Sequence, residues 1–164
     1  MHKTVTTLTL TAILAVTLAT GCNRSEDSDA KGKPQVALIM KSLANEFFKT
    51  MEDGARAHQK ANADAYNLIC NGIKDEQDVN KQIQIVNQMI ARGVDAIVIA
   101  PADSKALIAV CRKAKDKGIV VVNIDNQFDA ETLKLEGVAI PFVGPDNRKG
   151  ARLAGEHLAK SLTK

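Results

Sequence analysis

From residue 35 onward, short apolar runs alternate with longer segments whose apolar positions recur every three or four residues. The short runs are nearly continuous, which is typical of strands covered on both faces, as in a parallel sheet. The longer segments have the period of amphipathic helices. Strands are predicted at residues 35–40, 66–70, 96–100, 119–124 and 141–143, and helices at residues 46–61, 76–92, 104–117 and 147–161. This alternation predicts an α/β fold built on a doubly wound parallel sheet.

The predicted helices also carry signals for their buried faces and their ends. In the second helix, spacings of four, three and four predict one buried stripe: Val79, Ile83, Val86 and Ile90. Gly93 and Gly118 each follow a basic residue, which is the order that helix C-termini prefer. Ligands of doubly wound sheets bind outside the carboxyl ends of the strands. The residues that follow each strand are therefore the candidates for function.

The N-terminal segment has the pattern of an export signal. Lys3 precedes an apolar, Thr-rich run at residues 5–19, which is shorter than the roughly 20 residues of a membrane span. The run ends in LATGC, which resembles a bacterial lipobox. We therefore expect a lipoprotein signal peptide at residues 1–21, acylation of Cys22, and a polar tether at residues 22–34. The folded body would then be anchored by lipid to a bacterial membrane, in the periplasm or at the cell surface.

Composition and charge exclude several classes of function. The 164 residues are 45% hydrophobic, which is enough for one folded domain, and 22 basic residues nearly balance 19 acidic ones without a basic block. Nucleic-acid binding is therefore not expected. The three cysteines lack the close spacing of a zinc site. No GxGxxG follows a strand, and neither GxxxxGK[ST] nor GxSxG occurs. We expect no metal, no cofactor and no enzymatic activity.

The segment KSLANEFF after the first strand carries groups that suit a sugar. Lys41 and Asn45 provide hydrogen-bonding groups, and Phe47 and Phe48 provide flat apolar faces. An alternative interpretation is that Asn45 caps the following helix and both rings are buried in the core. Adjacent helical residues point about 100° apart, so both rings do not easily face one core stripe.

The ends of the third, fourth and fifth strands also carry polar residues. Asp125 follows the fourth strand, where its carboxylate could accept two hydroxyl bonds, although Asp also favours turns. After the third strand, Asp103 or Ser104 is expected to cap the next helix. After the fifth, the sequence VGPDN indicates a hinge at Gly144, Pro145 and Asp146, with Asp146 or Asn147 capping the last helix.

Taken together, these segments resemble the periplasmic sugar-binding proteins of ABC transporters, of the ribose- and allose-binding type. The resemblance is carried by KSLANEFF, DGA at residues 53–55, RGVDAIVIAPADS at residues 92–104, VVNIDNQ at residues 121–127, and VGPDN. It implies that Lys41 and Asn45 bond a monosaccharide, that Phe47 and Phe48 flank its ring, and that Asp125 accepts bonds from its hydroxyls.

The sequence departs from these relatives at two positions near the implied site. Asn126 is also expected to contact the sugar. It stands where ribose binders carry Arg, which argues against ribose itself. Glu46 stands where allose binders carry Pro. The identity of the sugar therefore remains open.

The resemblance further implies a two-lobed protein that delivers its sugar to an ABC permease. Residues 35–145 would form the N-terminal sugar-binding lobe, and residues 146–164 the hinge and first helix of a second lobe. We therefore expect a truncated form that binds sugar weakly or not at all. A binding protein that presents a sugar or an autoinducer to a signalling receptor is an alternative. A regulator of the Lac-repressor type and a flavodoxin-like enzyme fit less of the sequence.

Overall fold

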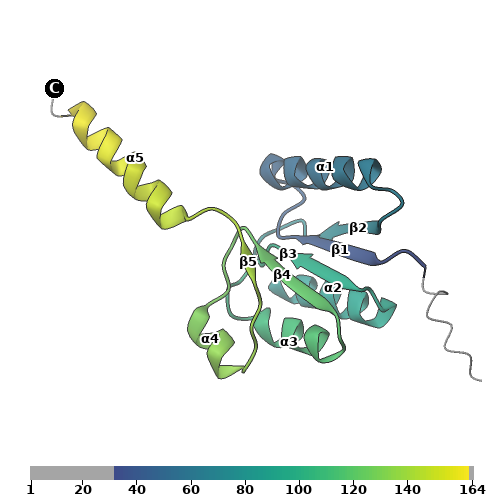
Figure 1. The fold of residues 1–164 in the computed structure, drawn as a ribbon. Helices are drawn as coiled ribbons and strands as arrows, with labels where there is room; N and C mark the ends of the chain where they lie inside the picture. Colours follow the sequence, from purple (N-terminus) through teal and green to yellow (C-terminus); the bar gives the residue numbers. More distant parts are fainter. Residues whose placement is uncertain (1–31, 163–164) are drawn as a thin grey trace, which may run out of the picture. The chain divides into compact units, whose positions relative to one another are not determined.

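The structure, a computed structural model, describes residues 32–162 and has alternating strands and helices. The strands are β1 (Gln35–Met40), β2 (Asn67–Gly72), β3 (Ala96–Ile99), β4 (Val120–Ile124) and β5 (Phe142–Val143). The helices are α1 (Glu46–Ala61), α2 (Val79–Arg92), α3 (Ile108–Asp116), α4 (Ala130–Leu135) and α5 (Asn147–Leu162). All strand pairs are parallel, in the order β2-β1-β3-β4-β5 (Figure 1). The predicted fold class is confirmed.

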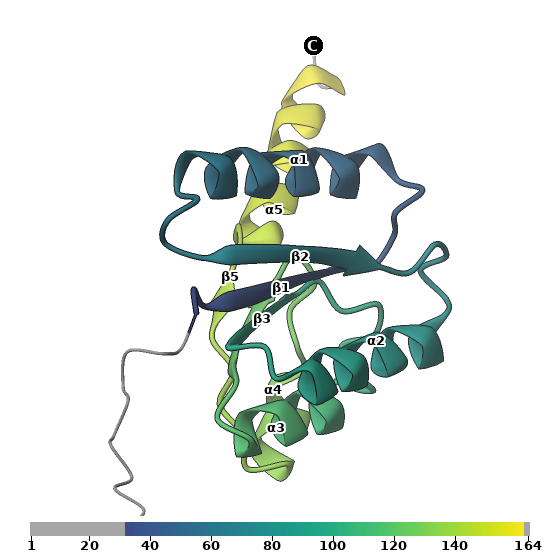
Figure 2. The ribbon, with the colours of Figure 1, turned by 90° about the vertical axis from the view of Figure 1, so that its right-hand side faces the viewer.

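Helices cover both faces of the sheet, as Figure 2 shows. On one face, α1 packs through Phe48 on a small cluster that includes Leu38 and Met40 of β1. On the other face, α2 and α3 pack on a larger cluster that includes Ile97 and Ile99 of β3. Strands with apolar residues on both faces read as continuous apolar runs, which is why the sequence revealed them.

The helix ends agree with most of the local signals. Gly93 (φ 72°) and Gly118 (φ 80°) adopt the left-handed conformation expected after a helix. However, α2 begins three residues later than predicted, because the Asp78 carboxylate caps it by accepting from the Lys81 N–H at 3.0 Å. Likewise α3 begins at Ile108 rather than at residue 104.

The late start of α3 corrects the capping prediction for this region. The Asp103 carboxylate accepts from the N–H groups of Lys105 and Ala106, at 2.8 and 2.7 Å, and so closes a turn before the helix. These bonds lower the pKa of Asp103, with the bond from Ala106 as the largest cause. The helix itself has no side-chain cap.

Two further differences from the prediction concern the buried face of α2 and an additional short helix. The buried face of α2 contains Gln82, Ile85 and Met89 in addition to two predicted residues, whereas Val79 and Ile83 are only partly buried at its margin. The six-residue helix α4 was not predicted, since it is too short to show a helical period. All described residues of α5 are exposed.

Candidate functional site

The first strand ends in a segment that the polypeptide backbone ties to the end of β2. The Leu43 N–H donates to the Ile73 carbonyl at 2.8 Å, and the Ile73 N–H donates to the Met40 carbonyl at 3.2 Å. Ser42 is buried, with its hydroxyl 3.5 Å from the Lys74 carbonyl. These bonds fix the start of the KSLANEFF segment and direct the side chain of Lys41 along the carboxyl edge of the sheet.

Asn45 caps α1, as one interpretation of the sequence predicted. Its side-chain oxygen accepts from the Phe47 N–H at 2.9 Å, and its backbone is extended. The residue is exposed, so its amide nitrogen is accessible from solvent. Capping and ligand binding are compatible, because the two roles use different atoms of the amide.

The two phenylalanines differ sharply in burial. Phe48 is 2% exposed and lies in the small core cluster, whereas Phe47 is 57% exposed. Their rings meet edge to face with centroids 5.1 Å apart. The alternative that both rings are buried is therefore wrong, and the 100° separation of adjacent helical residues explains the difference. Of these two residues, only Phe47 presents its ring to solvent.

The ammonium group of Lys41 lies near two carboxylates and one aromatic ring. Its Nζ lies 3.4 Å from Asp125 Oδ2, 3.8 Å from Glu76 Oε2 and 5.4 Å from the ring centroid of Phe48. The side chains of Lys41 and Asp125 are only 20% and 21% exposed. Three strand ends thus contribute to one charged cluster, because Lys41 follows β1, Glu76 follows β2 and Asp125 follows β4. Glu76 was not among the site residues predicted from the sequence.

The backbone at Asp125 is unusual. Its φ is 59°, and among the described residues it is the only one besides glycine with a positive φ. Asp and Asn adopt this region more readily than other residues, and such conformations gather at functional sites. The predicted turn and the predicted ligand position therefore coincide at Asp125.

The side chain of a buried residue, Asn123, holds the turn around Asp125 through hydrogen bonds. Its side-chain nitrogen donates to the Asn126 carbonyl at 2.8 Å, and its side-chain oxygen accepts from the Phe128 N–H at 2.8 Å. Phe128 itself is buried and anchors the far end of the turn. Asn126 donates one bond from its side-chain nitrogen to the Pro101 carbonyl at 3.2 Å.

A second buried amide, that of Gln82 on α2, joins the ends of β1 and β3. Its nitrogen donates to the carbonyls of Met40 (3.3 Å) and Ala100 (2.9 Å), and its oxygen accepts from the Ala102 N–H at 2.8 Å. Neither Gln82 nor Asn123 was predicted from the sequence. The available signal was a polar residue at a position where the helix or strand period requires a buried one.

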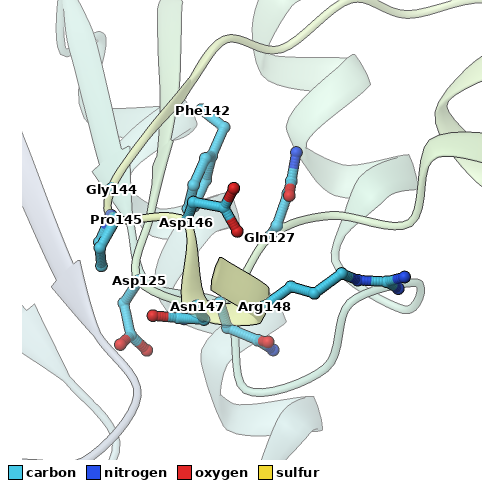
Figure 3. A pocket seen from close by; sticks show the side chains of 9 residues that line it. Asp125, Gln127, Phe142, Gly144, Pro145, Asp146, Asn147 and Arg148 are labelled. Atoms are coloured by element: carbon cyan, nitrogen blue, oxygen red, sulfur yellow. The ribbon is translucent and has the colours of Figure 1, made fainter. Parts of the chain in front are cut away.

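An open pocket of about 590 Å³ lies between the turn after β4 and the segment after β5 (Figure 3). It is lined by Asp125, Asn126, Gln127, Phe142, and residues 144–148. Figure 3 shows the side chains of Asp125 and Arg148 extending in opposite directions. The pocket therefore combines carboxylate, amide and guanidinium groups with one aromatic side chain.

The predicted hinge residues border this pocket. Gly144, Pro145 and Asp146 are exposed, and a Cβ built on Gly144 would lie 2.6 Å from the ring of Phe142. Asp146 caps α5, as one of the two expected residues, by accepting from the Lys149 N–H at 2.9 Å. Hinge motion at these residues stays a prediction.

The other predictions concern metals, membranes and the N-terminus. Within residues 32–162, no group of three or more His, Cys, Asp or Glu side chains could hold a metal ion. None of the helices in that same stretch is long and apolar enough to cross a bilayer. The signal peptide and Cys22 lie outside the described residues. The last residues of the predicted tether contact the body, since the Asn67 N–H donates to the Pro34 carbonyl.

Comparison with known proteins confirms the resemblance drawn from the motifs. The chain is 59% identical over 155 residues to the D-ribose/D-allose-binding protein of Pseudomonas aeruginosa, covering 92% of this chain and 49% of that protein. It is 37% identical over 127 residues to a D-apiose import binding protein of Paraburkholderia graminis, covering 77% of this chain and 38% of that one. The chain spans about half the length of the first of these curated relatives.

Solved structures of solute-binding proteins also resemble this chain. An ABC transporter solute-binding protein from Burkholderia multivorans superposes with a TM-score of 0.78 at 64% identity, over 80% of this chain and 46% of that one. A periplasmic solute-binding protein from Actinobacillus succinogenes, with bound D-allose, gives a TM-score of 0.74 at 36% identity, over 79% and 44% of the two chains. The family model described as a periplasmic binding protein domain matches residues 36–164. The chain therefore belongs to the family of periplasmic binding protein domains.

Proposed function

We propose that this chain is a monosaccharide-binding lobe of an extracytoplasmic solute-binding protein that serves an ABC permease. The observation that carries the proposal is the pair formed by Lys41 and Asp125, 3.4 Å apart at the carboxyl ends of two strands. A carboxylate accepts bonds from two neighbouring hydroxyls, and an ammonium donates to a third oxygen or to the sugar ring oxygen. No chemical step is part of this function.

Aromatic and amide groups would complete the recognition of the sugar from this lobe. Phe47 is exposed beside Phe48, whose ring lies 5.4 Å from Lys41 Nζ, so a sugar held by the charged pair could place a C–H face on Phe47. The amide nitrogen of Asn45 would donate to a hydroxyl at the same edge. We expect Phe48 to act through Phe47 and Lys41, because it is itself buried.

Relatives suggest which sugars to test first. The similar proteins are described as binding D-ribose and D-allose, or as structures with bound D-allose. We propose an aldose of this class for this chain, and we place D-allose first because Asn126 does not supply the guanidinium of ribose binders. The pocket that Asp125 lines is open, so we expect the affinity of this chain alone to be weak, roughly millimolar.

The experiment is a calorimetric and thermal-shift comparison with D-allose, D-ribose and other aldoses at tens of millimolar. A sugar that binds only the folded chain raises the melting temperature by mass action. Asp125→Asn keeps the shape and tolerates the positive φ but removes the charge, so it should abolish the shift. Asp116→Asn, at an exposed position on α3, is the matched control and should leave the shift unchanged. Equal shifts in all three proteins, or none with any sugar, would refute the proposal.

We also propose that Cys22 carries a lipid that anchors the chain to a bacterial membrane. The support is the LATGC sequence and the polar residues that follow it. Expression in a bacterium with labelled fatty acid should label the wild-type chain and leave Cys22→Ala unlabelled and in the soluble fraction. Labelling of the variant to the same extent would contradict acylation at this residue.

A further inference from the structure

We propose that three side-chain amides, those of Gln82, Asn123 and Asn126, form a positioning unit that holds Asp125 in its left-handed conformation. We call them the amide cluster. The inference rests on the proposed function, because it assigns these residues to the placement of the sugar-binding carboxylate. It also gives Asn126 a positioning role in addition to its predicted contact with the sugar.

The amide cluster is organised around the end of β3. Three consecutive carbonyls there each accept from a different member: Ile99 from Asn123 at 3.4 Å, Ala100 from Gln82 at 2.9 Å, and Pro101 from Asn126 at 3.2 Å. Gln82 and Asn123 are 0% and 1% exposed. The end of β3 therefore lies at the centre of a network that reaches the end of β1 through Gln82 and the turn after β4 through the two asparagines.

Within this network, Asn123 determines the shape of the turn. Its amide spans the turn by donating to the Asn126 carbonyl and accepting from the Phe128 N–H, both at 2.8 Å. The chain between these contacts must reverse within a few residues, and Asp125 takes the positive φ that this reversal requires. Asp125 itself supplies none of these bonds, which leaves its carboxylate available for Lys41 and for a ligand.

The arrangement of Asn126 supports this positioning role. Its side-chain nitrogen donates one bond to the Pro101 carbonyl at 3.2 Å, which ties the turn to the end of β3, while its second N–H and its side-chain oxygen are left for a ligand. Its carbonyl is engaged by Asn123. Throughout the described part of the chain, every buried side-chain nitrogen and oxygen atom has a hydrogen-bond partner. A network satisfied in this way keeps a turn in one conformation before any ligand arrives.

The test compares Asn123→Ser with Val121→Ala in the full chain. Val121 is a matched control, because it is 2% exposed on the same strand and the same face of the sheet, but it makes no bond to the turn. Two readouts are needed. The first is affinity for D-allose, and the second is the nuclear Overhauser effect between the amide proton and Hα of Asp125, which is strong only at positive φ and needs no sugar.

We expect Asn123→Ser to weaken sugar binding by about tenfold or more and to reduce the Overhauser effect within Asp125. Val121→Ala should lower the melting temperature while changing affinity less than about twofold and leaving that effect intact. If Asn123→Ser does not fold, Asn126→Ala replaces it, and the same reduction of the effect is expected. An unchanged Overhauser effect in the folded variant overturns the proposal.

The same design separates this inference from the proposed function. If the wild-type chain binds no aldose, the proposed function fails, and the Overhauser effect alone decides whether the amide cluster holds Asp125. If the wild type binds but Asn123→Ser and Val121→Ala lose affinity equally, the role of Asn123 is only to stabilise the fold, and the inference is wrong.

Discussion

Replacing Gln82 with leucine is expected to destabilise the fold strongly although it makes the core more apolar. Gln82 is fully buried on α2 and bonds three backbone groups at the carboxyl edge of the sheet. Leucine has a similar volume, so the substitution leaves little cavity. Its cost arises instead from the backbone groups that lose their partner inside the protein.

The magnitude follows from counting those groups. The Met40 carbonyl keeps the N–H of Ile73 at 3.2 Å and so remains paired, whereas the Ala100 carbonyl and the Ala102 N–H have Gln82 as their side-chain partner. Each orphaned buried group costs about 1–3 kcal/mol. The free energy of unfolding should therefore fall by about 2–6 kcal/mol, from two such groups.

The assay is urea unfolding followed by circular dichroism, with Gln84→Leu as the control. Gln84 lies on the same helix and is exposed, so the same change of residue there should alter the free energy of unfolding by less than about 0.5 kcal/mol. A loss below about 1 kcal/mol for Gln82→Leu would refute the reasoning, since it would mean that the two groups find other partners at little cost.

Three further predictions address packing, pH and thiol chemistry. A Cβ on Gly72 would lie 2.8 Å from the Met40 carbonyl oxygen, so Gly72→Ala should lower the free energy of unfolding in urea by about 1–3 kcal/mol. Gly54→Ala in α1, where the new Cβ meets open space, should raise that free energy. Hydrogen bonds from Thr132, first from its side chain and then from its N–H, lower the pKa of Asp129. The ionised Asp129 therefore stabilises the folded state above about pH 4, and this stabilisation is lost as the pH falls below that value. The melting temperatures of wild type and Asp129→Asn should therefore converge as the pH falls from 6 to 3, and a constant difference would contradict this. Burial raises the pKa of Cys111 to about 12, so peptide mass spectrometry should find it unlabelled by a thiol reagent at pH 8 until urea is added; labelling of the native chain would contradict its burial.

The strands and their order of appearance could be predicted because they depend on a property that sequence displays directly. The last four residues of β1 are all buried, and β4 alternates buried with partly buried residues after the exposed Val120, so both strands form nearly continuous apolar runs. Helix starts were harder to place. At the start of α2, Asp75 and Asp78 both accept backbone N–H bonds, and only the structure shows which of them begins the helix.

Predicting the site had a different limit. Lys41 and Asp125 were found because they are charged residues directly after strands, and the parallel sheet brings such positions to one edge. Gln82 and Asn123 were missed because an apolar pattern treats a polar residue at a buried position as an interruption. Their partners are backbone groups up to 42 residues away, and no local pattern identifies those.

The residues that were missed explain why the residues that were found lie together. Lys41 follows β1 and Asp125 follows β4, and β3 lies between these two strands in the sheet. Their separation of 3.4 Å therefore depends on how the ends of β1, β3 and β4 are held against one another. Gln82 joins the first two ends and Asn123 joins the last two. A substitution that preserves both charges but removes either amide should thus change the distance between the charges, and with it the set of hydroxyls that the proposed sugar site would accept.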